Sequence, residues 1–233
     1  MKTAVVTGGT RGIGEGVSRA LAKGGWRVIA VSASQEEIET FQSENGIETG
    51  ILDVTSDDAV SDFFGDLETL DALVNCAGIL RRGDEYDIDV FKRVIDVNLT
   101  GTMRCCVAAR DHLAASKGGI VNTASMLSTF GGPLVPAYSA SKGGVAQLTK
   151  ALAGRWAVDG IRVNAIAPGW IETEMTSPLR EDAERAAAIM ARTPMKRWGR
   201  TSEVGALVRW LLSDEAGFVT GAVYPVDGGY LAI

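Results

Sequence analysis

TGGTRGIG, from Thr7 to Gly14, is the stretch that decides the fold expected for this chain. Residues 3–7 form a short β-branched run that predicts a buried strand, and apolar residues from Ile13 onward recur at helical spacing. Glycine lets the backbone approach a ligand closely, and the start of a helix offers free N–H groups and a positive dipole end to a phosphate. Strand, glycine turn and helix in this order predict a dinucleotide phosphate site. A plain tight turn is the alternative, because the GxxxGxG spacing differs from the usual GxGxxG.

Length and composition limit the classes of protein to consider. A chain of 233 residues with 46% hydrophobic residues and 28 glycines suits one α/β domain with a large core. The net charge of −6 and the pI of about 4.9 disfavour nucleic acid or an anionic membrane as partner. No signal peptide or membrane span is expected, and Cys76, Cys105 and Cys106 indicate neither a disulfide framework nor a zinc site. The expected location is therefore the cytoplasm.

Strand-like and helix-like segments alternate along the chain. Strands are expected at residues 3–7, 27–31, 72–75, 120–123, 162–167 and 222–226, with one more closing at Ile51 and Leu52. Alternation of this kind predicts an α/β fold: a single doubly wound parallel sheet of Rossmann type, with about seven strands and helices on both faces, over residues 1–233. Ligands of such sheets bind at the carboxyl ends of the strands.

The expected helices differ greatly in length. Two long ones cover about residues 90–115 and 138–158, and a shorter one begins at Ser34 and Glu37, which fit a capping box. Residues 168–198 are too long for an ordinary connection, and they contain a helical stretch at 180–190. We expect this segment to form a lid over the substrate.

Tyr138 and Lys142 are the first candidates for chemistry, because a spacing of four places both side chains on one helix face. A tyrosine with its usual pKa near 10 is a poor base at neutral pH. An ammonium about 4 Å away contributes on the order of 4 kcal/mol at an effective dielectric of about 20, enough to lower that pKa by about two to three units. Ser125 follows the fifth strand at its carboxyl end, and Asn98 stands inside a helix, where asparagine favours a functional or kinked site.

Six motifs in order make the chain similar to the short-chain dehydrogenase/reductase family over essentially its whole length. TGGTRGIG matches the family's TGxxxGxG, and residues 75–78, NCAG, match its NNAG except at Cys76. Pro168, Gly169 and Thr173 match PGxxxT, and residues 226–229, VDGG, match the family's end motif. The catalytic tetrad of the family falls on four residues of this chain: Asn98, Ser125, Tyr138 and Lys142.

The resemblance implies a role for each of these four residues. Tyr138 would move the proton on the substrate oxygen, and Lys142 would lower the tyrosine pKa and bind the nicotinamide ribose. Ser125 would hydrogen-bond the substrate oxygen, and Asn98 would hold a water that relays protons. The cofactor would be bound by the following residues: Gly8, Thr10, Arg11, Gly12, Ile13, Gly14, Ser32, Asp53, Val54, Asn75, Ala77, Gly78, Tyr138, Lys142, Pro168, Gly169, Ile171 and Thr173.

The choice of cofactor depends on the end of the second strand. Folds that select NAD usually place an acid there, whereas this chain has Ser32, followed by Ala33 and Ser34. No carboxylate is expected there to repel a 2′-phosphate, and Arg11 can pair with one unless it is a solvated turn residue. The sequence therefore favours NADP, with NAD as the alternative.

Within the family, three stretches resemble sugar-acid dehydrogenases of the gluconate and 2-dehydro-3-deoxy-gluconate type: residues 78–82, 124–128 and 197–199. A guanidinium of Arg81 or Arg82 can hold a carboxylate bidentately, although both also fit as solvated surface residues. We expect hydride transfer between nicotinamide and a carbonyl or secondary alcohol of a sugar acid or polyol. The alternatives are a 3-oxoacyl-thioester (acyl-carrier-protein) reductase and an NADP-binding regulator without catalysis.

Two further expectations concern metal and assembly. His112 is the single histidine and is expected on the surface, so no catalytic metal is predicted. The two long helices carry more apolar and small surface than one sheet face covers, and Gly144, Ala151 and Gly154 suit close approach of another helix. By resemblance to the family, the partner is the same helix pair of a second subunit. We expect a homotetramer, or failing that a dimer.

Overall fold

The computed structural model describes residues 1–43 and 46–233 and contains a parallel sheet of seven strands. The strands lie in the order β3-β2-β1-β4-β5-β6-β7, and every neighbouring pair is parallel. This confirms the predicted fold class. Their bounds are β1 Thr3–Thr7, β2 Arg27–Ser32, β3 Ile47–Ile51, β4 Ala72–Asn75, β5 Gly119–Thr123, β6 Arg162–Pro168 and β7 Val223–Val226.

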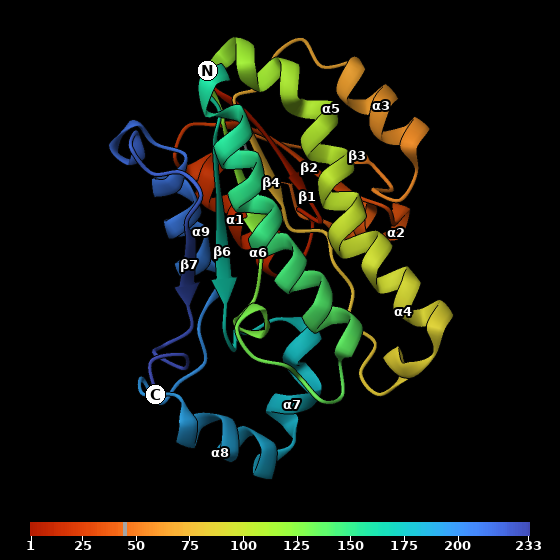
Figure 1. The fold of residues 1–233 in the computed structure, drawn as a ribbon, viewed down its shortest axis with the longest axis vertical. Coiled ribbons are helices and arrows are strands. Elements are labelled where there is room, and N and C mark those ends of the chain that lie inside the picture. Colours follow the sequence, from red (N-terminus) through yellow and green to blue (C-terminus); the bar gives the residue numbers. More distant parts are fainter. Residues whose placement is uncertain (44–45) are drawn as a thin grey trace.

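Helices cover both faces of this sheet (Figure 1). Figure 1 shows α4, α5 and α6 in front of the strands and α1 with α9 behind them. The helices are α1 Gly12–Lys23, α2 Gln35–Thr40, α3 Asp57–Gly65, α4 Ile88–Ile95, α5 Gly101–Ser116, α6 Pro136–Trp156, α7 Ser177–Glu181, α8 Ala183–Arg192 and α9 Thr201–Leu211. Short 3₁₀ turns lie at Asp84–Tyr86, Met126–Ser128, Ala157–Asp159, Glu174–Thr176 and Asp214–Ala216.

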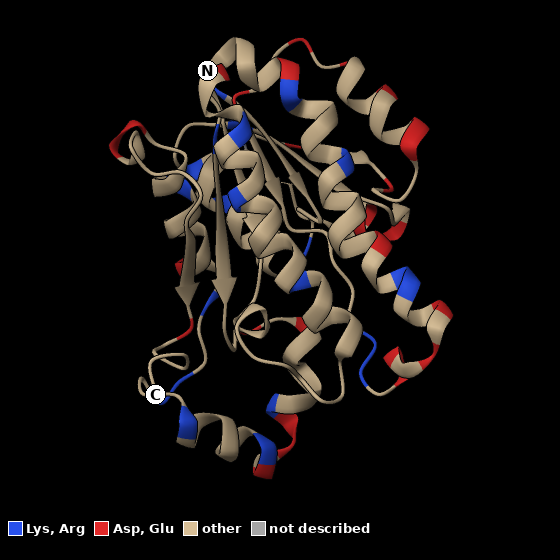
Figure 2. Cartoon of the chain, in the orientation of Figure 1, with Lys and Arg blue, Asp and Glu red and all other residues tan. Residues whose placement is uncertain are grey.

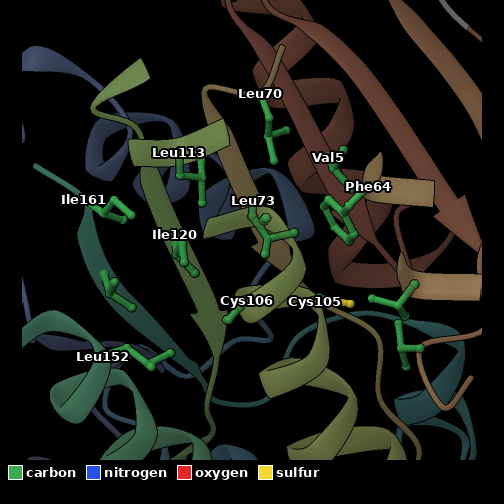
Figure 3. Close-up of a cluster of buried hydrophobic side chains, with 14 of the residues drawn as sticks. Val5, Phe64, Leu70, Leu73, Cys105, Cys106, Leu113, Ile120, Leu152 and Ile161 are labelled. Atoms are coloured by element: carbon green, nitrogen blue, oxygen red, sulfur yellow. The ribbon is translucent and has the colours of Figure 1, made fainter. Parts of the chain in front are cut away.

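Alternating residues of the central strands build the core on the two faces. Val5 of β1 packs into a cluster that includes Phe64 of α3 and Leu113 of α5 (Figure 3). Val6, one residue later, packs on the other face, where Leu21 of α1 belongs to the same cluster. Successive strand side chains point to opposite faces, so a strand buried on both faces is apolar throughout.

The helix predicted at about 90–115 is interrupted by a π-helical turn, Asp96–Thr100, between α4 and α5. Asn98 lies in this turn and is fully buried. Its amide nitrogen donates to the Ile79 carbonyl at 2.9 Å and to the Ser141 hydroxyl at 3.1 Å, and its oxygen accepts from the Ile79 N–H at 2.8 Å. A functional or kinked site was expected at this asparagine, and the structure places it in the π-helical turn, where its amide ties the helix to the loop after β4.

Residues 168–198 lie beyond the arrowheads of β6 and β7 in Figure 1. The helical stretch predicted at 180–190 is confirmed, with one break: α7 ends at Glu181 and α8 begins at Ala183. Asp182 separates them in an extended conformation, and its side chain accepts from the Arg185 N–H to cap α8.

Mean hydropathy is +0.10, and none of the helices in the described ranges, 1–43 and 46–233, has the length and apolar character needed to cross a membrane.

Candidate active site

The carboxyl ends of the strands bring the predicted motifs together. β1 leads into the glycine turn at Gly8, β4 into Cys76 to Gly78, β5 into Ser125 and β6 into Gly169. Chain order reverses between β1 and β4, which is where sheets of this kind bind ligands. Residues from all these strand ends line one cleft of about 810 Å³.

The glycine turn has the shape required for a dinucleotide phosphate. Gly12 begins α1 with a φ of +53°, and a Cβ added there would approach only the Thr173 side chain, at 3.6 Å. A Cβ on Gly14 would lie 1.9 Å from the Gly8 carbonyl oxygen, so this position requires glycine. The open surface of the turn and the free N–H groups at the start of α1 fit an anionic group of a cofactor.

Ser125, Tyr138 and Lys142 lie together at the other end of the cleft and all line its wall. The Lys142 ammonium donates to the Thr123 carbonyl at 2.7 Å and lies 5.5 Å from the centre of the Tyr138 ring. The Ser125 hydroxyl acts on the Tyr138 phenol as well, and it lowers the pKa of that phenol. The arrangement presents one phenol, one hydroxyl and one ammonium to a bound oxygen, and these groups can move and stabilise a proton.

Burial dominates the electrostatics of this end. It raises the pKa of Tyr138 to about 12, against the lowering effect of the Ser125 hydrogen bond, and the Glu85 carboxylate raises it further. Burial also lowers the pKa of Lys142 to about 8. The expected net lowering of the tyrosine pKa is therefore not what the protein's own groups produce, because removing the phenolate from water raises that pKa.

Most of the predicted cofactor residues line the cleft: Gly8, Arg11, Gly12, Ile13, Gly14, Ser32, Asp53, Val54, Ala77, Gly78, Tyr138, Lys142, Pro168, Gly169, Ile171 and Thr173. Thr10, Asn75 and Asn98 are buried and do not line it. Asn75 donates to the Asn122 side chain at 2.9 Å inside the protein, so it supports the end of β4. Asp53 accepts from the N–H and hydroxyl of Thr55, and the backbone bond is the first cause holding the Asp53 pKa below its usual range.

The end of the cleft at Arg11 and Ser32, where the adenosine of the cofactor is expected and which is called the adenosine end below, contains a carboxylate that the sequence interpretation did not place there. Glu37 accepts from the Ser32 hydroxyl at 2.6 Å, from the Thr10 hydroxyl at 3.3 Å and from the Arg11 guanidinium at 3.0 Å. The predicted capping box is only half correct: the Ser34 hydroxyl caps the Glu37 N–H, while the Glu37 carboxylate points to Ser32 and Arg11. The expected absence of a carboxylate near Ser32 is therefore wrong.

Two more features were missed or misplaced. Glu85 is buried beside Tyr138, and nothing in its exposed acidic surroundings, residues 84–87, signals that position. His112 is half-buried rather than on the surface, with its Nε2 at 3.0 Å from the Phe64 carbonyl.

Arg81 and Arg82 line the cleft as exposed side chains. In the part of the chain that the structure describes, no three His, Cys, Asp or Glu side chains are grouped to hold a metal.

A dinucleotide turn at one end of a cleft and a serine, tyrosine and lysine at the other define a nicotinamide-dependent oxidoreductase. The family model described as "Enoyl-(Acyl carrier protein) reductase" matches residues 8–231. The chain belongs to the short-chain dehydrogenase/reductase family, and it is an NAD(P)-dependent dehydrogenase/reductase.

Several relatives are similar over nearly their full length. A 2-dehydro-3-deoxy-D-gluconate 5-dehydrogenase of Bacillus subtilis is 41% identical, with 99% of this chain and 95% of the relative covered. A galactitol 2-dehydrogenase (L-tagatose-forming) of Cereibacter sphaeroides is 39% identical, with 97% and 94% covered. A solved structure from Agrobacterium tumefaciens, described as a 2-deoxy-D-gluconate 3-dehydrogenase with bound NADP, is 40% identical with a TM-score of 0.92, and 100% and 97% of the two chains are covered.

Proposed function

We propose that this protein oxidises a secondary alcohol of a sugar acid or polyol, or reduces the corresponding carbonyl, with NAD(P). The carrying observation is the half-buried phenol of Tyr138, which lies beside Lys142 and lines one cleft with Ser125 and the glycine turn. When bound, the cofactor supplies or accepts the hydride. Relatives that act on sugar acids and polyols support the substrate class.

Each side chain has one task in this proposal. The Tyr138 hydroxyl gives a proton to the carbonyl oxygen during reduction, or takes it from the alcohol during oxidation. Ser125 orients that oxygen, and Lys142 places a positive charge beside the phenol. Asn98 holds the loop after β4 and the start of α6 together through Ile79 and Ser141. Residues 168–198, which contribute Thr173 and Arg185 to the cleft wall, serve as a lid.

The arginines at the mouth of the cleft support an acidic substrate. Arg81 donates to the neighbouring Leu80 carbonyl at 3.3 Å, and among the described residues neither Arg81 nor Arg82 forms an ion pair. A guanidinium without an acidic partner can bind a substrate carboxylate bidentately. We propose that these two residues select sugar acids over neutral polyols.

Absorbance at the nicotinamide band tests the function, with NAD and NADP each offered a panel of sugar acids, polyols and 3-oxoacyl thioesters. We expect the highest kcat/KM on a sugar acid. An Arg81→Ala, Arg82→Ala double variant is expected to raise KM for the acid by about tenfold or more while leaving KM for a matched polyol within about twofold. An equal change for acid and polyol would contradict carboxylate recognition.

A 3-oxoacyl-thioester reductase is the second candidate, because the matching family model is described by an acyl-carrier-protein substrate. The same panel separates the two: preference for the thioester would favour this candidate. A regulator without catalysis needs no Ser125, Tyr138 and Lys142 cluster, and turnover of any panel member excludes it.

We also propose that the protein is a homotetramer in the cytoplasm. In Figure 2 most of the α5 and α6 ribbons is uncharged, with a few charged residues between, and α5 exposes the apolar side chains of Met103 and Val107. Gly154 of α6 has open space beside it, whereas a Cβ on Gly144 would meet Leu99 at 2.7 Å, so Gly144 serves packing within the subunit. The three cysteines are free thiols, as suits a reducing compartment. Sedimentation equilibrium at micromolar concentration tests the assembly, and a single species of monomer mass would refute it.

A further inference from the structure

Glu85 is a buried acid with no role in the steps described so far. It lies in the 3₁₀ turn Asp84–Tyr86, ahead of α4, and only 1% of its surface is exposed. Its neighbours Asp84, Tyr86 and Asp87 are all exposed. Burying a carboxylate is costly unless its oxygens accept hydrogen bonds, so the contacts of Glu85 indicate what the burial accomplishes.

Each oxygen of Glu85 accepts from the backbone of a different part of the cleft. Oε1 accepts from the Arg81 N–H at 2.9 Å, in the loop that presents the two arginines. Oε2 accepts from the Tyr138 N–H at 2.8 Å, in the first turn of α6. One carboxylate therefore joins the substrate-facing loop to the backbone of the residue that performs the proton transfer.

The start of α6 lacks a local cap. The first N–H groups of a helix have no partner within it, and the residue before Pro136, Val135, offers no side-chain acceptor. Glu85 supplies that acceptor from 53 residues earlier in the chain. A negative charge at this end of the helix is also favoured by the helix dipole.

We propose that Glu85 is a positioning residue, which holds the backbone of Tyr138 and the loop of Arg81 at one fixed spacing so that the substrate oxygen meets the phenol. The proposal rests on the proposed function, because the spacing matters only if Tyr138 acts on a substrate held by that loop.

The charge of Glu85 has a second consequence, which a purely structural role would not have. It disfavours the phenolate and so raises the pKa of Tyr138. From α6, the Lys142 ammonium lies over the ring, and from the end of β5 the Ser125 hydroxyl lowers the pKa of the phenol. Cys76, after β4, stays a neutral thiol, because burial raises its pKa to about 11. Removing the Glu85 charge should therefore lower the pKa of Tyr138.

The test is the pH profile of kcat for alcohol oxidation by Glu85→Gln. Oxidation needs the phenolate as base, so the rate rises with pH along an acid limb that reports the Tyr138 pKa in the complex. We expect kcat to fall by about tenfold, because an amide can accept only one of the two N–H groups. We expect the acid limb to move down by about one pH unit.

Two matched controls come from the same turn. Asp84→Asn removes an equal charge from an exposed position one residue away. Tyr86→Phe removes the hydroxyl that donates to the Pro133 carbonyl at 2.8 Å, an anchor of the turn without charge. Both should keep kcat and the acid limb close to wild type. The proposal is overturned if the acid limb of kcat in Glu85→Gln stays at its wild-type pH. It is also overturned if Asp84→Asn moves the acid limb by as much as Glu85→Gln does.

Two further measurements cover the remaining outcomes. If Glu85→Gln does not fold, Glu85→Asp is the second variant, because it keeps the charge and shortens the side chain. It should lower kcat and leave the acid limb at its wild-type pH, and an unchanged kcat would contradict the positioning role.

The rate of hydrogen exchange at the Arg81 and Tyr138 amides should rise in Glu85→Gln and not in Asp84→Asn. Unchanged exchange in Glu85→Gln would contradict the positioning role of Glu85 even without turnover. Absent wild-type turnover on every substrate counts against the proposed function instead.

Discussion

The two ends of the cleft hold their charged groups by different means. At the catalytic end, Lys142 and Glu85 are buried, and their partners are backbone groups: the carbonyl of Thr123 and the N–H groups of Arg81 and Tyr138. At the adenosine end, the Arg11 side chain is 55% exposed and that of Glu37 is 25% exposed, and the two form an ion pair. The Glu37 carboxylate also accepts hydrogen bonds from the Ser32 and Thr10 hydroxyls.

This difference separates what the fold fixes from what a few substitutions can change. A charge held by the backbone moves only if a strand end or a helix start moves with it, so the proton chemistry is bound to the architecture. A charge held by side chains can be exchanged without disturbing a strand or helix. We therefore expect substitutions at the catalytic end to cause large losses of rate. Substitutions at the adenosine end should cause smaller changes in cofactor preference.

The largest effect is expected for Tyr138→Phe. The phenol is the proton donor and acceptor, so its loss should lower kcat by about 10²-fold or more. Cofactor affinity, measured by fluorescence titration, should stay within about twofold, because the variant leaves the glycine turn and the start of α1 unchanged. A variant that retained more than about a tenth of the wild-type rate would show that another group moves the proton.

Lys142→Met is expected to be next, with kcat lower by on the order of 10² and weaker cofactor binding. The ammonium favours the phenolate, so its removal should move the acid limb of kcat to higher pH, opposite to Glu85→Gln. Burial lowers the pKa of Lys142 to about 8, so the ammonium loses its proton as pH rises through about 8. The difference from wild type in an oxidation pH profile should shrink above that pH; a constant difference would contradict the electrostatic role.

These two residues were predictable from the sequence because their signal is local. Tyr138 and Lys142 are four apart on one helix, and the strand ends and the glycine turn follow from periodicity over a few residues. Glu85 was not predictable, because its partner Tyr138 is 53 residues away and its own surroundings look like a solvated acidic turn. The pKa of Tyr138 was misjudged for a related reason: burial of the phenol is a property of the folded cleft, not of the spacing to Lys142.

Glu37 shows where a correct local pattern still gives a wrong conclusion. Ser34 and Glu37 have capping-box spacing, and the serine half forms as expected. The glutamate carboxylate bonds instead to Ser32, at the end of β2, and to Arg11, which the turn after β1 brings alongside β2. Propensity predicted the start of the helix, and only the pairing of β1 with β2 decides where this side chain points.

Glu37→Gln should change cofactor choice by an intermediate amount. The wild-type carboxylate repels a 2′-phosphate and neutralises Arg11, so its loss should raise the ratio of kcat/KM with NADP to kcat/KM with NAD by about tenfold. The matched control is Glu36→Gln, an exposed acid on the same helix, which should leave the ratio within about twofold. An unchanged ratio in Glu37→Gln would show that the adenosine ribose lies elsewhere.

The smallest effect is expected from salt, and it tests both ends in one experiment. Screening shortens from about 10 Å at 0.1 M to about 3 Å at 1 M and acts mainly on exposed charges. Arg11 and Glu37 are partly exposed, so raising salt from about 0.05 to 0.5 M should change the preference between NADP and NAD by about two- to threefold. Lys142 and Glu85 are buried, so the acid limb of kcat should move by less than about 0.2 pH unit over the same range. The test measures the cofactor preference and the acid limb of kcat at each salt concentration on one enzyme preparation. The opposite result is an acid limb of kcat that moves with salt while the preference between NADP and NAD stays constant. It would contradict the comparison, because it would show that the charges accessible to solvent are at the catalytic end.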